Sequence, residues 1–448
     1  MNGILFTLLA GLLPFLPAPR VTAANAPAPG AEGTRTLRVW SMFQKAEPLA
    51  RWMEEVAKGF EKANPGVKVE ISWKGRDILT MARGAIQEKK PPDLIDQDDQ
   101  TMIQLAKEGV LEPLDGAMNE RPEGSDIMGL DSWALRFEPA ALALAKHDGL
   151  AYLWPRSLYT SGFFCHSKAL KDAGVSAPKT WAEFLALCEA MKKAGKAPIA
   201  ADGTVDFYND WWFCWLAIRS AGPEKFLKAA KNDGVAWDDP DFLKAAAGVE
   251  EIVKKGFFQN GYEGSIFPRA QHGWITARQA MMLCGAWLPK EMEPSILAAE
   301  KKAAGPVALE MFPFPEVDGG KGGFEVAEAW FNGWAIPKDA ANKALAVKFL
   351  QFATSETNVK ALVAEGDPSA VRGTPQPRFL EAQSDIFAKA KVFVPQKGGI
   401  GRDVPEWTKR VLHPANNRLF KGEIDAAAFI AELKKAHEAF YEGKSGKS

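Results

Sequence analysis

In the first clearly patterned stretch of the chain, the spacing of the apolar side chains changes twice. Residues 37–40 form a short apolar run, and apolar side chains then recur at helical spacing over residues 49–60. An Asn-Pro-Gly sequence at 64–66 ends the helical pattern, and residues 67–71 alternate as in a half-buried strand. The pattern predicts a strand–helix–strand unit over residues 37–73.

This unit predicts a parallel sheet, because parallel strands need a crossover connection, which here is the helix. A second crossover over residues 77–90 leads into a predicted strand at 93–95. Ligands of such sheets bind beyond the carboxyl ends of the strands. The polar side chains that follow the strands are therefore candidate ligand contacts: Gln44, Gln97, Asp98, Asp99 and Gln100. Alternatively, Asp98 or Asp99 caps a helix that begins near Thr101.

A second α/β region is predicted from about residue 159. Thr180 and Glu183 have the spacing of a capping box at a helix start. Residues 206–219 read as an aromatic helix, and residues 280–283 read as a short buried strand before Gly285-Ala286-Trp287. The pattern as a whole predicts two α/β bodies.

Composition narrows the class of protein. The chain has 448 residues, of which 47% are hydrophobic and 25% charged, as in soluble globular proteins with two or three domains. The formal net charge of −1 gives no electrostatic reason to expect nucleic acid as a partner. Residues 1–23 resemble a signal peptide and 24–35 a disordered linker, so we expect an exported protein. The signal region contains no cysteine, so we expect no lipid anchor.

Motifs for metal binding and catalysis are missing from the sequence. The chain has four cysteines without a C-x-x-C pair and five histidines, so we expect no metal site. Whether the cysteines form disulfides or stay as buried thiols is open. The glycine cluster at 319–323 lacks the ending of a P-loop and predicts a turn. No two carboxylates have a spacing in the sequence that would identify them as the catalytic pair of a glycosidase.

Tryptophan is the most distinctive side chain, with 15 copies against 5 tyrosines. A tryptophan in a helical stripe is expected in a core. Five others lie at predicted strand ends or in loops: Trp40, Trp154, Trp287, Trp330 and Trp407. Their flat rings suit the C–H face of a pyranose, although core packing is the alternative for each of them.

Five stretches together resemble the extracellular solute-binding proteins of ABC sugar importers, the maltose-binding-protein-like class. The resemblance spans essentially the whole mature chain. It depends on the order and spacing of residues 37–40 with 59–69, 91–94, 178–184, 280–287 and 334–350.

The resemblance implies an α/β, two-lobed periplasmic-binding-protein fold, type II-like, with a parallel-type sheet flanked by helices in each lobe. Lobe one would comprise residues 36–158 plus 334–371, and lobe two residues 159–332 plus 373–448. Hinge crossings are expected near 159–161, 328–333 and 371–374. The ligand would lie between the lobes.

The resemblance also implies which side chains bind the ligand. These are the candidate residues Gln44, Gln97, Asp98, Asp99, Gln100, Trp154, Tyr159, Trp287, Trp330, Asn332, Arg372 and Trp407. The chain departs from the family at two points: a polar run surrounds Gln97 where a maltose binder has an aromatic, and Cys165-His166 replaces the usual Tyr-Asn. Maltodextrin is therefore not the expected ligand.

The expected function is the periplasmic substrate-binding component of an ABC importer. It would capture a mono- or oligosaccharide and deliver it to a membrane permease, as a monomer without cofactor or enzymatic activity. One alternative is a binder of a polyol or glycerol phosphodiester, in which Arg372 would contact an anionic group or would be a plain surface charge. The alternative from another class is a secreted glycoside hydrolase with a Trp-lined cleft.

Overall fold

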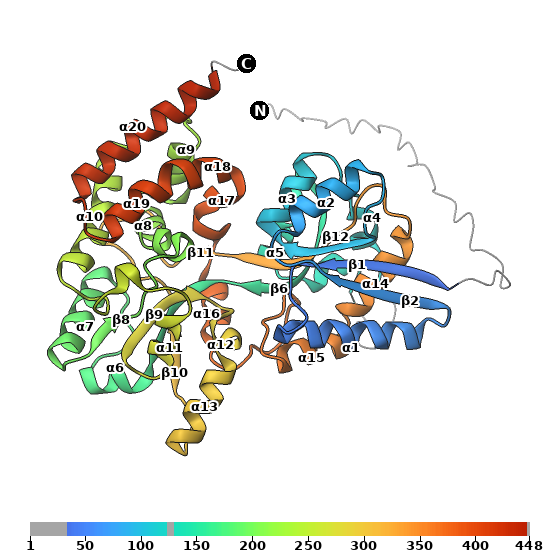
Figure 1. Ribbon diagram of the computed structural model, residues 1–448, viewed down its shortest axis with the longest axis horizontal. Helices are drawn as coiled ribbons and strands as arrows, with labels where there is room; N and C mark the ends of the chain where they lie inside the picture. The colour runs from blue at the N-terminus through green and yellow to red at the C-terminus, as the bar shows by residue number, and fades with distance from the viewer. Residues whose placement is uncertain (1–33, 123–129, 446–448) are drawn as a thin grey trace, which may run out of the picture.

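The computed structural model describes residues 34–122 and 130–445. It has two lobes that lie side by side and are joined by extended segments (Figure 1). The predicted two-lobed α/β fold is confirmed. The expected signal peptide at 1–23 and nearly all of the expected linker lie outside the described residues.

Lobe one is built on a five-stranded sheet of order β2-β1-β3-β12-β6. Strands β1, β2 and β3 are parallel, whereas β12 is antiparallel to both of its neighbours. The predicted strand–helix–strand unit is confirmed, with α1 between β1 and β2. The strands are β1 (Arg35–Ser41), β2 (Val67–Trp73), β3 (Leu94–Asp98), β6 (Leu153–Tyr159) and β12 (Trp330–Ala335).

Helix α1 shows how the sheet of lobe one is covered. It buries Leu49, Trp52, Val56 and Phe60, and Phe60 packs edge-on against Phe349 of α14. The helices of this lobe are α1 (Pro48–Ala63), α2 (Ile78–Gln87), α3 (Asp99–Lys107), α4 (Asp115–Asn119), α5 (Pro139–Leu144), α14 (Lys343–Ala353) and α15 (Glu356–Ala364). A short hairpin joins β4 (Lys146–His147) to β5 (Leu150–Ala151).

Lobe two is built on a four-stranded sheet of order β10-β7-β9-β8. Strand β7 is antiparallel to β9 and β10, and β8 is parallel to β9. All four cysteines lie buried in this lobe as free thiols, which decides the question that the sequence left open. The strands are β7 (Ser161–His166), β8 (Ala197–Ile199), β9 (Gln279–Gly285) and β10 (Leu309–Phe312).

Helix α8 is the central helix of lobe two and is buried from Asn209 to Ala221. The predicted capping box is present at the start of α7, where Thr180 Oγ1 accepts a hydrogen bond from the Glu183 N–H at 3.2 Å. The helices of this lobe are α6 (Ser167–Ala173), α7 (Trp181–Lys193), α8 (Asp206–Ala221), α9 (Pro223–Ala230), α10 (Pro240–Lys254), α11 (Arg269–Ile275), α12 (Leu288–Glu291), α13 (Glu293–Ala303), α17 (Ile400–Asp403), α18 (Pro405–Trp407), α19 (His413–Phe420) and α20 (Ala426–Ser445).

Three segments connect the lobes and are hydrogen-bonded to one another. The first joins β6 to β7, the second joins β11 (Val326–Glu328) to β12, and the third contains α16 (Glu381–Lys389) and β13 (Val392–Val394). Gln383 of α16 binds the first segment, because its amide accepts from Thr160 N at 3.2 Å and donates to Leu158 O at 3.0 Å. Strands β11 and β13 pair in parallel, which links the second and third segments.

The expected division of the chain at 158/159, 332/334 and 371/373 stays a prediction. In the structure, β12 pairs with β6 from Trp330 onward and with β3 from Asn332 onward, both in the five-stranded sheet. The second connection therefore reaches lobe one before Asn332.

The glycine cluster at 319–323 is a turn folded over the end of α8. The buried Arg219 guanidinium donates to Phe314 O at 2.8 Å and to Gly322 O at 3.1 Å. The backbone carbonyl of Arg219 accepts from Lys321 N at 2.9 Å. A Cβ at Gly320 would lie 2.2 Å from the Arg219 carbonyl oxygen, so glycine is needed for this close approach.

We predict that Gly320→Ala destabilises the protein by about 1–3 kcal/mol, because the added methyl must push the turn off Arg219. Gly116→Ala is the matched control, since a Cβ there meets no atom within 4 Å. Denaturant unfolding measures both variants. Equal stability of the two variants would show that the turn moves freely.

Candidate functional site

An aromatic cluster lies where the two lobes meet. Trp211 of α8 stacks on Trp287 with ring centroids 5.7 Å apart, and Trp287 meets Trp330 edge-on at 5.6 Å. Trp330 stacks in turn on Tyr159 at 5.9 Å. Tyr159 and Trp330 are paired at the end of the lobe-one sheet, and their side chains pack in the hydrophobic core of lobe two.

The cluster is buried at its base and open on lobe two. Tyr159 and Trp330 are only 3% and 4% exposed. Trp287 and Tyr208 are half-buried, and Phe207, which packs on Trp287 and Trp211, is 41% exposed. Exposed aromatic rings at a junction between lobes favour contact with a ligand over a purely structural role.

Gly285 explains how Trp287 is placed. Strand β9 ends at Gly285, and a Cβ there would lie 2.1 Å from Cζ3 of Trp287. The indole therefore lies directly over the glycine, where any larger residue would displace it. The Gly-Ala-Trp sequence therefore sets the position of the ring.

Glu291 lies one helical turn beyond Trp287, and its N–H donates to Trp287 O at 2.9 Å. Gln271 Nε2 donates to the Glu291 carboxylate at 2.8 Å. Desolvation by the surrounding protein raises the pKa of Glu291, although its side chain is exposed. The pKa also responds to the charges of Arg76 and Glu47 on lobe one. Glu291 therefore lies within electrostatic reach of lobe one.

On lobe one, Asp98 and Asn332 are direct neighbours in the register of β3 and β12. Asp98 caps α3, because its carboxylate accepts from Thr101 N at 2.8 Å, so the capping alternative holds for this residue. Desolvation is the main cause that raises the pKa of Asp98. Asn332 Nδ2 donates to the Tyr159 hydroxyl at 3.3 Å, which in turn donates to Asp367 at 2.7 Å.

Three of the candidate glutamines also lie on lobe one. Gln44 is exposed, and its N–H donates to Glu47 at 2.7 Å. Gln97 is buried, and its side-chain oxygen accepts from the N–H of Asp98 at 2.9 Å. Gln100 Nε2 reaches across the junction and donates to Gln396 at 2.9 Å. Of these, Gln44 presents its side chain to solvent.

Other candidate residues lie away from the aromatic cluster. Trp154 is fully buried in lobe one and donates to Thr354 Oγ1 at 3.2 Å. Trp407 is fully buried in lobe two, where it stacks on Trp237 at 5.4 Å. Neither ring has a face open to a ligand, so we leave both out of the proposed site.

Asp99 and Arg372 are also not part of the aromatic cluster. Asp99 is buried and accepts a hydrogen bond from Phe331 N at 3.0 Å, which ties α3 to β12. Arg372 is exposed on lobe one, beside Arg136. We leave both residues out of the proposed site.

The structure adds residues that the sequence did not single out: Arg76, Phe207, Tyr208, Trp211, Gln271 and Glu291. The sequence held one usable pattern for the aromatic ones, because Phe207 and Trp211 are four apart on a predicted helix and so share a face. Glu291 is likewise four residues after Trp287. Gln271 is brought to Glu291 only by tertiary packing.

The buried carboxylate of Glu328 supports the aromatic cluster from behind. Its oxygens accept from Ser161 Oγ at 2.5 Å, from Trp211 Nε1 at 3.1 Å and from the N–H of Lys397. The Lys397 ammonium pairs with Asp210 at 2.6 Å and lies 3.7 Å from the centre of the Phe207 ring. Desolvation raises the pKa of Glu328 to about 7.

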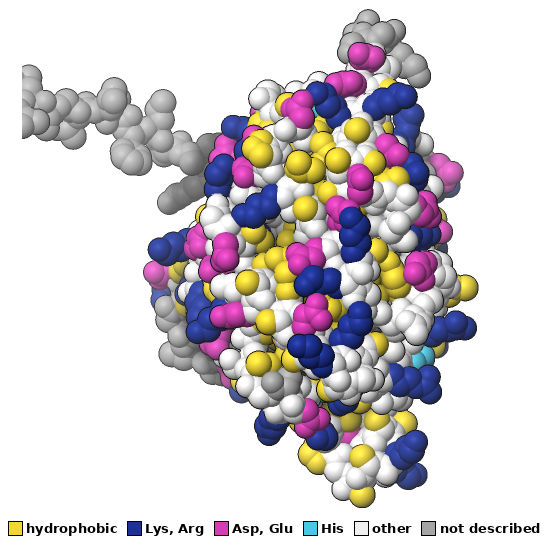
Figure 2. All heavy atoms as spheres, turned by 90° about the vertical axis from the view of Figure 1, so that its left-hand side faces the viewer, with side chains coloured by type: hydrophobic (Ala, Val, Ile, Leu, Met, Phe, Trp, Pro, Cys, Tyr) yellow, Lys and Arg dark blue, Asp and Glu magenta, His cyan; other side chains and the backbone are white. Residues whose placement is uncertain are grey.

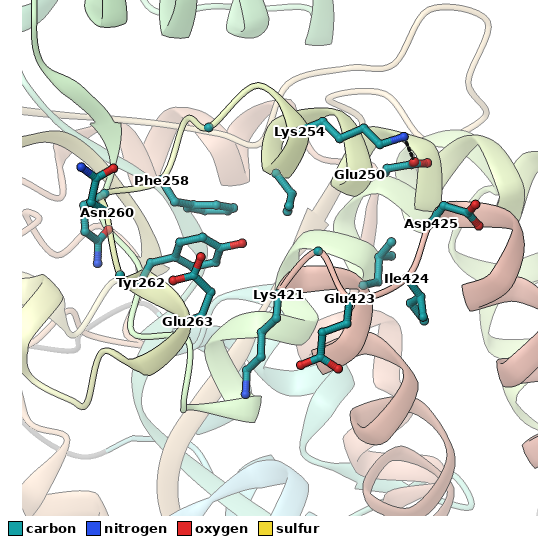
Figure 3. A pocket seen from close by; sticks show the side chains of 16 residues that line it. Glu250, Lys254, Phe258, Asn260, Tyr262, Glu263, Lys421, Glu423, Ile424 and Asp425 are labelled. Atoms are coloured by element: carbon teal, nitrogen blue, oxygen red, sulfur yellow. Dashed lines mark ion pairs between the residues drawn. The ribbon is translucent and has the colours of Figure 1, made fainter.

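A recess of about 610 Å³ lies on the outside of lobe two, between Phe258 and Tyr262 on one side and residues 421–425 on the other (Figure 3). None of the aromatic cluster lines it. The face of lobe two turned away from lobe one carries positive and negative side chains interspersed (Figure 2). Neither feature has the aromatic surface of the junction.

Residues 34–122 and 130–445 contain no group of three or more His, Cys, Asp or Glu side chains placed to hold a metal ion. Within the same ranges, every helix is too short or too polar to cross a membrane.

Comparison with known sequences identifies the family. The bacterial extracellular solute-binding proteins match residues 45–360, which is more than half of the chain. The chain belongs to this family. Its members are binding proteins and not enzymes.

Individual relatives of this solute-binding protein are distant. A probable sugar-binding periplasmic protein of Rhizobium meliloti is 27% identical over 93% of this chain and 95% of its own length. An ABC transporter extracellular-binding protein of Pyrococcus horikoshii is 27% identical over 56% of this chain, and the match spans only 57% of that relative. The solved structure of a chitin oligosaccharide binding protein superposes with a TM-score of 0.73 at 22% identity, covering 91% of this chain and 98% of that one. That likeness supports the fold.

We predict that stability depends on pH through Glu328 and Asp99. Desolvation raises both pKa values to about 7, whereas the unfolded chain has ordinary carboxyl values. Between those values the native state binds more protons, so its stability falls as pH rises from about 4 to about 7. Each pKa unit corresponds to ~1.4 kcal/mol.

Glu328→Gln tests this assignment, because the amide cannot titrate. Between pH 5 and pH 8, the unfolding free energy of Glu328→Gln minus that of the parent should increase steadily as pH rises. Glu263→Gln, at an exposed site of lobe two, is the control. A difference between Glu328→Gln and the parent that stays constant with pH would contradict the assignment.

Proposed function

We propose that this solute-binding protein is the carbohydrate receptor of an ABC importer. The observation that carries the proposal is the aromatic cluster at the junction of the lobes, where Trp287, Tyr208 and Phe207 leave ring surface uncovered. Flat aromatic surface suits the C–H face of a sugar ring, and the nearby carboxylates and amides suit its hydroxyl groups.

In the proposed mechanism the sugar stacks on Trp287 of lobe two and hydrogen-bonds to groups of both lobes. On lobe one these groups are Gln44, Asp98 and Asn332, and on lobe two they include Glu291. Only a closed arrangement of the lobes lets one ligand make both sets of contacts. Ligand binding therefore favours closure through its higher affinity for the closed form.

The family and the relatives support this proposal. One relative is named as a sugar-binding periplasmic protein, another as an extracellular-binding protein of an ABC transporter. We propose accordingly that the protein acts in the periplasm as a monomer without a lipid anchor and delivers its ligand to the permease subunits of its transporter.

A polyol or glycerol phosphodiester is a weaker candidate. The side chain considered for an anionic group, Arg372, lies on the surface of lobe one beside Arg136. At the aromatic cluster, the Lys397 ammonium is paired with Asp210, and Glu291 places a carboxylate one helical turn from Trp287. This carboxylate disfavours a phosphate by like-charge repulsion.

We predict that Trp287→Ala weakens sugar binding by about 2 kcal/mol, roughly thirtyfold, without unfolding the protein. Gly285→Ala should weaken binding by a similar factor, because its methyl group displaces the Trp287 ring. Thermal-shift screening against a panel of saccharides finds the ligand, and calorimetry measures its affinity for each variant.

Gly84→Ala in α2 is the matched control for the glycine variant, since a Cβ there meets no atom within 4 Å. Its affinity should equal that of the parent. Unchanged affinity in both Trp287→Ala and Gly285→Ala would show that the Trp287 indole does not contact the sugar. A panel without any binding saccharide would contradict the proposed function itself.

A further inference from the structure

Resting on the proposed function, we propose that Glu291 and Gln271 form an acceptor pair that makes the receptor selective for uncharged sugars. The pair takes two hydrogen-bond donors from the ligand that stacks on Trp287. It rejects sugars that carry a carboxylate or phosphate at the same place. Four observations on the described residues support this proposal.

The first observation is the unused acceptor of Gln271. Its side chain is fully buried. Nε2 donates to Glu291 at 2.8 Å and lies 3.5 Å from the Tyr208 hydroxyl, whereas Oε1 has no hydrogen-bond partner within the described part of the chain. A buried carbonyl oxygen without a donor is unfavourable, and a ligand hydroxyl or amide N–H would satisfy it.

The second observation is the position of Glu291 relative to Trp287. The two residues are four apart, and a backbone hydrogen bond of one helical turn joins them at 2.9 Å. Side chains at this spacing share one face of a helix. A sugar ring stacked on the indole directs its hydroxyl groups outward along the ring edge. Glu291 is therefore placed to accept from the rim of a ring on Trp287.

The third observation is that Glu291 is exposed on the surface of lobe two. Its carboxylate keeps acceptor capacity beyond the bond from Gln271. Arg76, the arginine whose charge acts on Glu291, is itself paired with Glu47 at 2.7 Å. The positive charge of Arg76 is thus offset by its own partner and leaves the acceptor available to a ligand.

The fourth observation is the charge balance around the aromatic cluster. Glu291 contributes a carboxylate one helical turn from Trp287. Arg76 and Glu47 pair with each other, and the Lys397 ammonium, which lies 3.7 Å from the centre of the Phe207 ring, pairs with Asp210. The carboxylate of an anionic sugar would bring a like charge beside Glu291 and would offer no hydrogen-bond donor to Glu291 or Gln271. Selectivity of this kind depends on repulsion of the wrong ligand as much as on attraction of the right one.

Calorimetry with matched sugars tests the proposal. The probes are neutral oligosaccharides, each paired with a counterpart whose C6 hydroxymethyl group is oxidised to a carboxylate. The parent should bind the neutral member at least about tenfold more tightly at pH 7.5. Glu291→Gln, which keeps the size of the side chain, should weaken binding of the neutral sugar by about tenfold. It should also narrow the ratio between the affinities for the two sugars.

Glu263→Gln is the matched control, since it removes an exposed carboxylate elsewhere on lobe two and should leave both affinities unchanged. Equal or tighter binding of the oxidised sugar by the parent would overturn the acceptor pair while leaving the proposed function intact. A ratio between the two sugars that is unchanged in Glu291→Gln would also overturn it. Failure of every neutral sugar to bind would instead contradict the proposed function.

Discussion

The carboxylate of Glu328 is buried at the point where the segments between the lobes come together. It accepts hydrogen bonds from Ser161 in the first connection and from the N–H of Lys397, which follows the third, while its own residue ends β11 in the second. A buried carboxylate requires such partners, because desolvation without them is very unfavourable. This requirement ties the three connections together at Glu328.

The same carboxylate links these connections to the proposed binding surface. Glu328 also accepts from the Trp211 indole, and Trp211 stacks on Trp287. Gly285 leaves the space in which the Trp287 ring lies. The exposed aromatic surface is thus positioned by buried contacts at its back, so a ligand meets a preformed surface, which lowers the entropy lost on binding.

The sequence predicted what depends on local pattern. The unit of β1, α1 and β2 and the capping box at Thr180 are encoded within a few residues, and both were predicted. The environment of each tryptophan could not be predicted in this way. Trp154 and Trp287 were both expected at strand ends or in loops. Trp287 is half-buried, whereas Trp154 is fully buried and donates to Thr354, two hundred residues away. Burial of that kind follows from tertiary packing, as does the pairing of Gln271 with Glu291.

Small-angle X-ray scattering with and without a saturating saccharide tests the central claim most directly. The account predicts that the radius of gyration falls when the sugar is added, because the lobes close around it, and that the sugar is recovered chemically intact. A radius of gyration that is unchanged at saturation, or a sugar recovered with a cleaved glycosidic bond, would contradict the account.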